Sequence, residues 1–337
     1  MRAALQAETI RQEELFAALE PEWWELWRRV SSATPFQSPA WLIPWWRHFH
    51  PGELFVVTVR QEGRLVGLAP FYVEEGTRRI LPVGISVSDY LDVLIEPGHE
   101  ASAGRALVEQ VAVADTTWHE WSLEELAPDA VALSLPAPPH CEELSSAQSA
   151  CPVLDLPKAA TIWDVVPARP RRDTNLARNR AARRGDVRID EVGGADGPAF
   201  LDALFRLHEA RWRSRGEAGV LADERVRRFQ QEVLPRLMNA GLARCYVLGM
   251  AGRAAAVHYG LMHRRRAYAY LLGFDPDFAF ESPGVILMAH AIERALAEDA
   301  REFHFLRGPE AYKYAWGATD RWNRRRSFRR VAGRLAS

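Results

Sequence analysis

The sequence predicts a mixed α/β (α+β) chain of two tandem domains, each with a mostly antiparallel sheet flanked by helices. A length of 337 residues corresponds to about two domains of ordinary size. The same order of elements (a hairpin, a strand, a helix and a last strand) also occurs twice. The offset between the copies is nearly constant, as Gly63 and Gly252 in the two Gly-Arg turns and Tyr90 and Tyr270 in the following strands indicate.

Two helices open the first copy, and the second of them has clear start signals. Ser38 is suited to the N-cap and Pro39 to the first helical position. A β-hairpin follows, because two runs of β-favouring residues flank the turn at Gly63. We expect helices at 22–30 and 39–50, strands at 54–59, 65–73 and 90–95, a helix at 101–114 and a strand at 118–123.

The second copy repeats this order after a linking region. The Pro- and Ser-rich stretch 136–157 is interpreted as a connector or an edge strand, and 174–184 as a helix that Gly185 ends. We place the boundary near residue 165, which gives domains 1–165 and 166–337. We expect helices at 200–215 and 223–239, strands at 245–250, 254–262 and 267–274, a helix at 283–298 and a strand at 302–306.

Composition excludes several classes of protein. Hydrophobic residues make up 48% and charged residues 26% of the chain, as in an ordinary globular protein. No apolar run approaches the roughly 20 residues that a membrane span needs. The N-terminal 20 residues are polar and helical in character, unlike a signal peptide. The three cysteines fit neither a metal cluster nor a disulfide framework, so we expect a cytoplasmic protein without a metal.

Basic residues are concentrated in two segments, although the formal net charge is only −1. Residues 169–184 and 321–334 are both rich in Arg and contain almost no acid. Such segments indicate either an anionic partner or a solvated helix face and a frayed tail. Only Lys158 and Lys313 are lysines, which draws attention to the segment around residue 313.

The first candidate site is the start of the helix expected at 283–298. Ser282 can cap this helix, Pro283 fits its first turn, and Gly284 leaves space above the backbone. The open amides of Gly284, Val285 and Ile286 would then form an anion site that suits a pyrophosphate. The alternative is a well-capped helix with no ligand.

The second candidate site is the loop at 307–317, which follows the last strand. It contains the cations Arg307 and Lys313 and the aromatic residues Tyr312, Tyr314 and Trp316. Such a loop can hold an anionic or thioester-bearing ligand, with a Tyr hydroxyl near the leaving group. The alternative is a structural loop with buried aromatic side chains.

These motifs carry a resemblance to a known family. The chain resembles the GNAT-type acyltransferases of the cellulose-biosynthesis acetyltransferase (CelD-like, BioF2-like) family, in which an Asp usually stands at the position of His304. The tandem arrangement is also similar to that of the Fem-type aminoacyl-tRNA-dependent peptidyltransferases. The motifs are Phe36-Gln37-Ser38, Trp41 and Trp45-Trp46, the basic stretch 178–184, Phe274-Asp275-Pro276, Ser282-Pro283-Gly284, Leu306-Arg307-Gly308, Tyr312-Lys313-Tyr314 and Trp316-Gly317.

The resemblance implies an acyl-CoA co-substrate, such as acetyl-CoA, held by the second domain. Ser282, Gly284 and Val285 would contact the pyrophosphate, with Arg307 or Lys313 reaching a phosphate or an acyl carboxylate. Main-chain amides of the strand before this helix, around Leu272 and Phe274, would hold the thioester carbonyl.

The implied reaction is direct attack of an amine or hydroxyl on the thioester. Three residues near the site along the chain are candidates for the base, and we leave the choice open. Tyr312 or Tyr314 would be the acid for the departing thiolate. The candidate bases are Asp275, Glu281 and His258.

The first domain is expected to shape an acceptor groove or to have lost its chemistry. Six of the twelve tryptophans precede residue 47; helix-spaced Trp favours a core, while stacking on a glycan acceptor is the alternative. Two other functions remain open: a Fem-type aminoacyl-tRNA-dependent transferase that binds RNA through 169–184, and a non-catalytic binding protein. A small-molecule or glycan acceptor is expected, and nucleic acid only under the Fem-type alternative.

Overall fold

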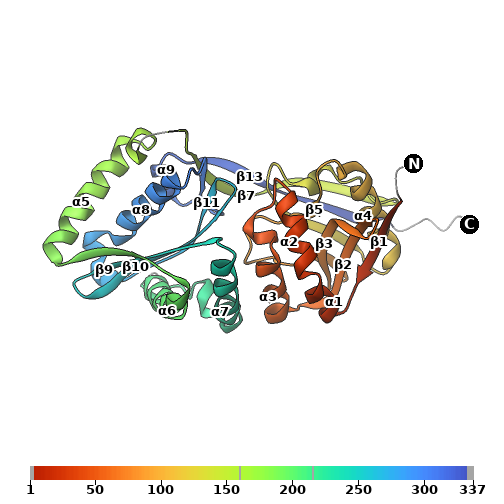
Figure 1. The fold of residues 1–337 in the computed structure, drawn as a ribbon, viewed down its shortest axis with the longest axis horizontal. Coiled ribbons are helices and arrows are strands. Elements are labelled where there is room, and N and C mark those ends of the chain that lie inside the picture. The colour runs from red at the N-terminus through yellow and green to blue at the C-terminus, as the bar shows by residue number, and fades with distance from the viewer. Residues whose placement is uncertain (1–3, 159–160, 215, 332–337) are drawn as a thin grey trace, which may run out of the picture. The chain divides into compact units, whose positions relative to one another are not determined.

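The computed structural model describes residues 4–158, 161–214 and 216–331 (Figure 1). The chain divides into two compact units, Met1–Ser149 with Arg321–Ser337, and Ala150–Asp320. This division differs from the boundary expected near residue 165. The long strand β7 (Cys141–Asp155) contributes residues 141–149 to the first unit and 150–155 to the second.

The first unit is a sheet covered by helices, with strand order β1-β2-β3-β4-β6-β13. Helix α4 packs against β1, β2 and β3, and α2 contacts β3. Of the six N-terminal tryptophans, all but Trp24 are buried, which confirms their expected place in the core. The elements are β1 (Leu5–Ile10), α1 (Glu13–Ala18), α2 (Glu20–Arg29), α3 (Pro39–Phe49), β2 (Gly52–Gln61), β3 (Arg64–Glu74), β4 (Arg79–Pro82), β5 (Leu94–Ile95), α4 (Glu100–Ala114), β6 (Glu120–Leu126) and β13 (Thr319–Arg330).

The second unit has the strand order β7-β12-β11-β10-β9-β8. Helix α8 packs on β9, β10 and β11 and is covered by α5, while α6 contacts β10 and β11 and α7 contacts β9 (Figure 1). The mixed α/β fold with mostly antiparallel strands is thus confirmed. The elements are α5 (Ala168–Arg184), β8 (Val187–Glu191), α6 (Gly197–Arg213), α7 (Glu224–Asn239), β9 (Ala243–Met250), β10 (Arg253–His263), β11 (Arg266–Phe274), the 3-10 helix η6 (Pro276–Glu281), α8 (Pro283–Ala297), β12 (Glu302–His304) and α9 (Ala311–Ala315).

Three elements differ from the sequence expectation. The N-terminus forms strand β1, because residues 5–10 pair in full register with β2. The strand expected at 90–95 shortens to β5, since the Asp92 carboxylate instead accepts hydrogen bonds from the amides of Val131 and Ala132. The stretch 136–157, expected as a connector or an edge strand, contains β7, which is an interior strand. The expected helix end at residue 215 and residues 332–334 of the basic segment lie outside the described residues.

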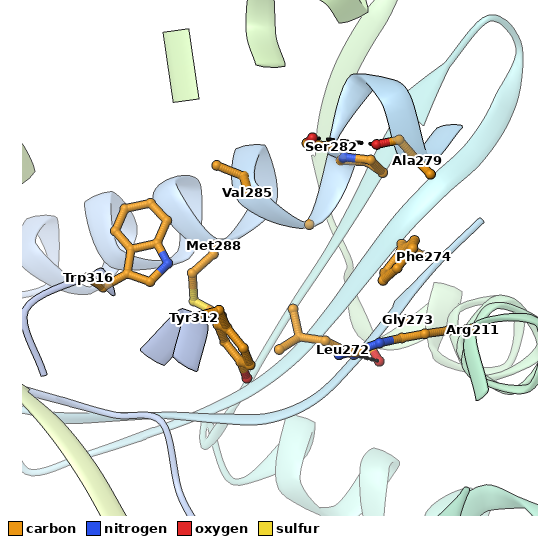
Figure 2. A pocket seen from close by; sticks show the side chains of 12 residues that line it. Arg211, Leu272, Gly273, Phe274, Ala279, Ser282, Val285, Met288, Tyr312 and Trp316 are labelled. Carbon is orange, nitrogen blue, oxygen red and sulfur yellow. Dashed lines mark hydrogen bonds between the residues drawn. The ribbon is translucent and has the colours of Figure 1, made fainter. Parts of the chain in front are cut away.

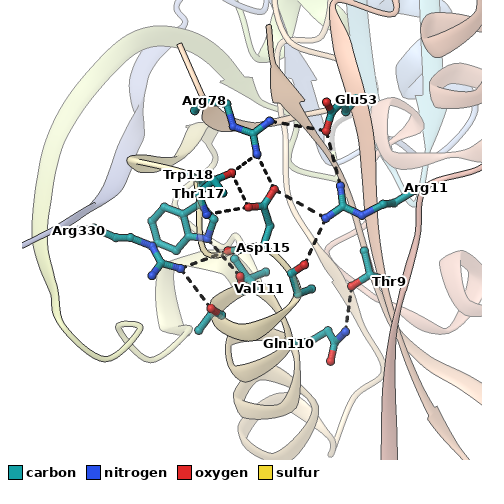
Figure 3. A network of polar contacts seen from close by, with 12 residues as sticks. Thr9, Arg11, Glu53, Arg78, Gln110, Val111, Asp115, Thr117, Trp118 and Arg330 are labelled. Carbon is teal, nitrogen blue, oxygen red and sulfur yellow. Dashed lines mark hydrogen bonds and ion pairs between the residues drawn. The ribbon is translucent and has the colours of Figure 1, made fainter. Parts of the chain in front are cut away.

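The described part of the basic segment 321–334 is strand β13, so it is not a frayed tail. Arg326 is 7% exposed and donates to both carboxylate oxygens of Glu143, at 2.6 and 3.1 Å. Arg325 and Arg329 pair with Glu120 on β6. Figure 3 shows Arg330 at the end of this strand, above the Trp118 ring and beside an ion-pair network that joins β1 to the end of α4. The charge of this segment therefore fixes the strand within its own unit.

His258, a candidate base, lies in the core of the second unit. It is 2% exposed on β10, and its ring stacks on Tyr246 at 5.8 Å. Burial lowers its pKa to about 3. A buried imidazole with a lowered pKa is poorly suited to act as a general base, which needs both access to the acceptor and a pKa near neutrality.

No helix in the described ranges is long and apolar enough to cross a membrane.

Replacement of Arg326 tests the anchoring of β13. Arg326→Leu should lower the free energy of unfolding by about 2–4 kcal/mol, because Glu143 and the Ala132 carbonyl lose their charged donor. The matched change Arg329→Leu, at a side chain 58% exposed, should cost under about 1 kcal/mol. Chemical denaturation measures both values, and equal losses would contradict the anchoring role.

The buried His258 predicts a pH dependence of stability. Below pH about 6.5 the unfolded chain protonates this imidazole while the folded chain does not. Stability should therefore fall with decreasing pH, by about 1.4 kcal/mol per pH unit for each such group. In His258→Phe, the stability difference between neutral and mildly acidic pH should shrink, whereas the same change at the exposed His119 should leave it intact. Denaturation curves at the two pH values measure this difference in stability. The prediction is contradicted if both variants show the same difference as the wild type.

Candidate active site

A pocket of about 330 Å³ lies within the second unit. It is bounded by the end of β11, the start of α8, helix α9 and the last turn of α6 (Figure 2). Most of its wall is apolar. Its lining residues are Arg211, Leu272, Gly273, Phe274, Ala279, Ser282, Pro283, Gly284, Val285, Met288, Tyr312 and Trp316.

The divergence of β11 and β12 exposes one edge of β11 to this pocket. The two strands pair in parallel at only three positions, from Arg266 to Tyr268. The chain then follows β7, as the amide of Phe305 donates to the Pro152 carbonyl at 2.9 Å. In the described chain, residues 270–274 of β11 therefore have a strand partner on the β10 side alone. Apart from the Leu272 carbonyl, which accepts from Arg211, their main-chain groups on the other side are available to an extended ligand.

The start of α8 forms the opposite wall. Ser282 adopts a left-handed conformation (φ 52°, ψ 54°), and its side chain does not cap the helix, contrary to expectation. The amide of Val285 donates to the Ser282 carbonyl at 3.0 Å, so this amide is not open as expected. The amide of Gly284 has no backbone acceptor in the described part of the chain. A Cβ at Gly284 would meet nothing within 4 Å, which places this backbone against open space.

Lys313 holds the loop that presents the aromatic wall. Its side chain is 2% exposed, and Nζ donates to the carbonyls of Leu306, Arg307 and Gly308 at 3.0, 2.6 and 3.0 Å. Glu310 also pairs with Nζ at 2.8 Å. These partners occupy the ammonium donors, so Lys313 is a positioning residue instead of the expected phosphate ligand. A compact ammonium suits three converging carbonyls better than a planar guanidinium.

Helix α9 then places Tyr312 and Trp316 on the pocket wall. They lie four residues apart and therefore on one face of the helix. Figure 2 shows the Tyr312 ring near the side chains of Met288 and Leu272. Tyr314 points elsewhere, because its hydroxyl donates to Asp320 at 2.8 Å, a bond that raises its pKa. Of the two candidate acids, Tyr312 therefore lines the pocket and Tyr314 does not.

The two candidate carboxylates, Asp275 and Glu281, are not among the residues that line the pocket in the described part of the chain. Asp275 caps η6 by accepting from the Asp277 amide at 3.1 Å, and it pairs with Arg253. Glu281 is 4% exposed, and Arg184 lies 3.7 Å from one of its carboxylate oxygens. Arg307 contributes its carbonyl to Lys313 and is likewise not among the lining residues of the described chain. Of the predicted residues, the structure brings together Leu272, Phe274, Ser282, Gly284, Val285 and Tyr312.

Arg211 is a pocket residue that the sequence analysis missed. Its guanidinium donates to the Leu272 carbonyl at 3.4 Å and lies 5.3 Å from the Phe274 ring centre (Figure 2). The helix spacing could have identified it. Arg211 follows the buried Leu204 and Leu207 by seven and four residues, which places it on the buried stripe of α6. A cation on the buried stripe of a helix indicates a functional or structural partner. Among the described residues, no group of His, Cys, Asp or Glu is suited to hold a metal.

Comparisons with known proteins agree with this geometry. Residues 168–314 match the family model described as an acetyltransferase (GNAT) domain. No curated protein matches the chain by sequence.

Solved structures share the fold over nearly the whole chain. The crystal structure of FemX is 9% identical with a TM-score of 0.62 and covers 95% of this chain and 96% of its own. The C-terminal domain of a putative lysylphosphatidylglycerol synthetase from Agrobacterium fabrum is 12% identical with a TM-score of 0.59, covering 95% and 93%. A tandem GNAT protein from the clavulanic acid biosynthesis pathway is 17% identical with a TM-score of 0.50, covering 98% and 100%. The chain thus shares its fold with these solved structures, and residues 168–314 match the model of a GNAT acetyltransferase domain.

Proposed function

We propose that the protein is an acyl-CoA-dependent acyltransferase of the CelD-like type, which transfers an acyl group to an amine or hydroxyl of a small-molecule or glycan acceptor. One observation carries the proposal: a single pocket joins the open edge of β11, the exposed backbone at Gly284 and the Tyr312 side chain. These parts match the needs of a thioester substrate with a diphosphate at one end.

The pocket suits the co-substrate in shape and chemistry. The Gly284 amide and the Ser282 hydroxyl lie at the positive end of α8, where a pyrophosphate is stabilised. The open edge of β11 offers hydrogen bonds to the amides of a pantetheine arm. The apolar side chains of Val285, Met288 and Leu272 cover its methylene groups.

In the proposed reaction, the acceptor nitrogen or oxygen attacks the thioester carbonyl directly. A new C–N or C–O bond forms, the C–S bond breaks, and the acyl group moves in one displacement. Amides around Leu272 and Phe274 stabilise the developing oxyanion, and the Tyr312 hydroxyl protonates the departing thiolate. The described pocket wall contains no carboxylate or imidazole. We therefore assign removal of the acceptor proton to water, not to Asp275, Glu281 or His258.

A change at Gly284 tests co-substrate binding. In Gly284→Val the new Cβ would meet no protein atom within 4 Å, and the side chain would occupy the space above the helix start. Calorimetry should show acetyl-CoA binding at least about tenfold weaker, because the diphosphate loses its approach to the backbone. Gly194→Val is the matched control, since its Cβ also meets nothing within 4 Å and it lies outside the pocket wall.

Three outcomes of that calorimetry separate the possible functions. Acetyl-CoA binding by the wild type and Gly194→Val, with loss in Gly284→Val, supports the proposal. Salt-sensitive tRNA binding without CoA binding would instead support the Fem-type alternative. Binding of neither ligand would support a non-catalytic protein.

A pair of tyrosine variants tests the assigned acid. Tyr312→Phe should lower kcat about 100-fold with a smaller effect on KM for acetyl-CoA, because a general acid acts in the transition state. Tyr314→Phe should retain activity, since that hydroxyl is bonded to Asp320. Thiol release from acetyl-CoA with a panel of amino sugars and amines measures both. Comparable losses in the two variants would contradict the assignment.

A further inference from the structure

The exposed face of α5 combines positive charge with a protruding apolar side chain. The helix buries the stripe Pro170, Thr174, Ala177 and Ala181. A different face, with side chains three or four residues apart, presents Arg169, Arg172, Leu176, Arg180 and Arg183. Leu176 is 48% exposed within this row of guanidinium groups.

A second apolar side chain protrudes beside this face. Phe280 on η6 is 68% exposed, and Arg180 joins it to α5 by donating to its carbonyl at 3.1 Å. The Arg180 guanidinium also lies 4.2 Å from the Phe280 ring centre. Phe280 directly follows Ala279, which lines the pocket, so this surface borders the candidate active site.

Part of the charge on this face is not neutralised by the protein. Arg169 pairs with Asp173 at 3.6 Å, and Arg184 lies 3.7 Å from Glu281. Arg172 and Arg183, by contrast, are exposed and have no carboxylate partner in the described part of the chain. An anionic partner therefore gains attraction here without displacing an existing ion pair.

We propose that this face of α5, with Phe280, docks on an anionic lipid surface. Arginines flanking two protruding apolar side chains are the pattern of a protein that lies on a membrane, with the cations at the headgroups and the apolar groups among the acyl chains. Nucleic acid fits less well, because Leu176 offers no face for base stacking and Arg180 covers one face of Phe280. The acceptor would then be presented at, or near, a lipid surface.

Vesicle sedimentation of the full chain without CoA tests this surface independently of catalysis. Wild-type protein should bind vesicles of equal parts phosphatidylglycerol and phosphatidylcholine, and not vesicles of phosphatidylcholine alone. The double variant Arg172→Gln/Arg183→Gln should bind about thirty-fold more weakly at low salt, from the typical contribution of two surface cations. The matched control Arg105→Gln/Arg206→Gln removes two exposed arginines elsewhere and should bind as wild type.

The apolar contribution is tested by Phe280→Ser. The vesicle affinity of this variant should be about tenfold lower than that of the wild type at low salt. At high salt, where the wild type keeps some binding, this variant should not bind. The proposal would be overturned if the wild-type protein does not bind anionic vesicles. It would also be overturned if the α5 and control double variants lose vesicle binding equally. If the wild type binds tRNA but not vesicles, and the α5 double variant loses the tRNA binding, the surface is a nucleic-acid surface instead. Thermal unfolding of each variant excludes loss of fold as the cause.

Discussion

The candidate site depends on the separation of two parallel strands. β11 and β12 start side by side and pair only from Arg266 to Tyr268. Because the chain after β12 continues along β7, the second half of β11 keeps hydrogen-bonding groups that no strand satisfies in the described chain. Backbone groups of this edge without a strand partner need other hydrogen-bond partners, so the edge favours a polar, extended ligand or ordered water. The pocket is where the sheet is left incomplete.

The remaining walls are held in place by contacts outside the pocket. Lys313 draws three successive carbonyls toward one ammonium, which fixes the loop before α9 and with it Tyr312 and Trp316. Gly273 packs so closely on α6 that a Cβ would lie 2.9 Å from the His208 amide nitrogen. The close packing of Gly273 on α6 sets the distance between β11 and Arg211. The side chains that face the ligand are therefore positioned by a rigid scaffold, which favours precise binding.

Local signals in the sequence predicted much of the fold and part of the site. Helix start signals and hairpin turns located most elements, and Pro283-Gly284 marked the helix whose start lines the pocket. The sequence left the stretch that contains β7 open between a connector and an edge strand, because the polar residues in the first part of β7 have little strand character and become a strand by pairing with neighbours distant in sequence.

The errors within the site share one cause. Lys313 and Tyr314 have the residue types of ligand-binding groups, but their partners are a cluster of carbonyls and Asp320. Arg211 comes from a helix about 60 residues before β11, so proximity along the chain gave no reason to select it. Residue type and local spacing identify what a side chain can do, whereas tertiary packing decides which ligand it meets.

Hydrogen exchange, followed residue by residue with and without CoA, tests the central claim most directly. If the open edge of β11 and the start of α8 hold the co-substrate, CoA should slow the exchange of amides in 270–274 and at Gly284. Amides of β2 and β3 in the first unit should not change. Unaltered exchange in 270–274, with protection confined to another part of the chain, would contradict the account.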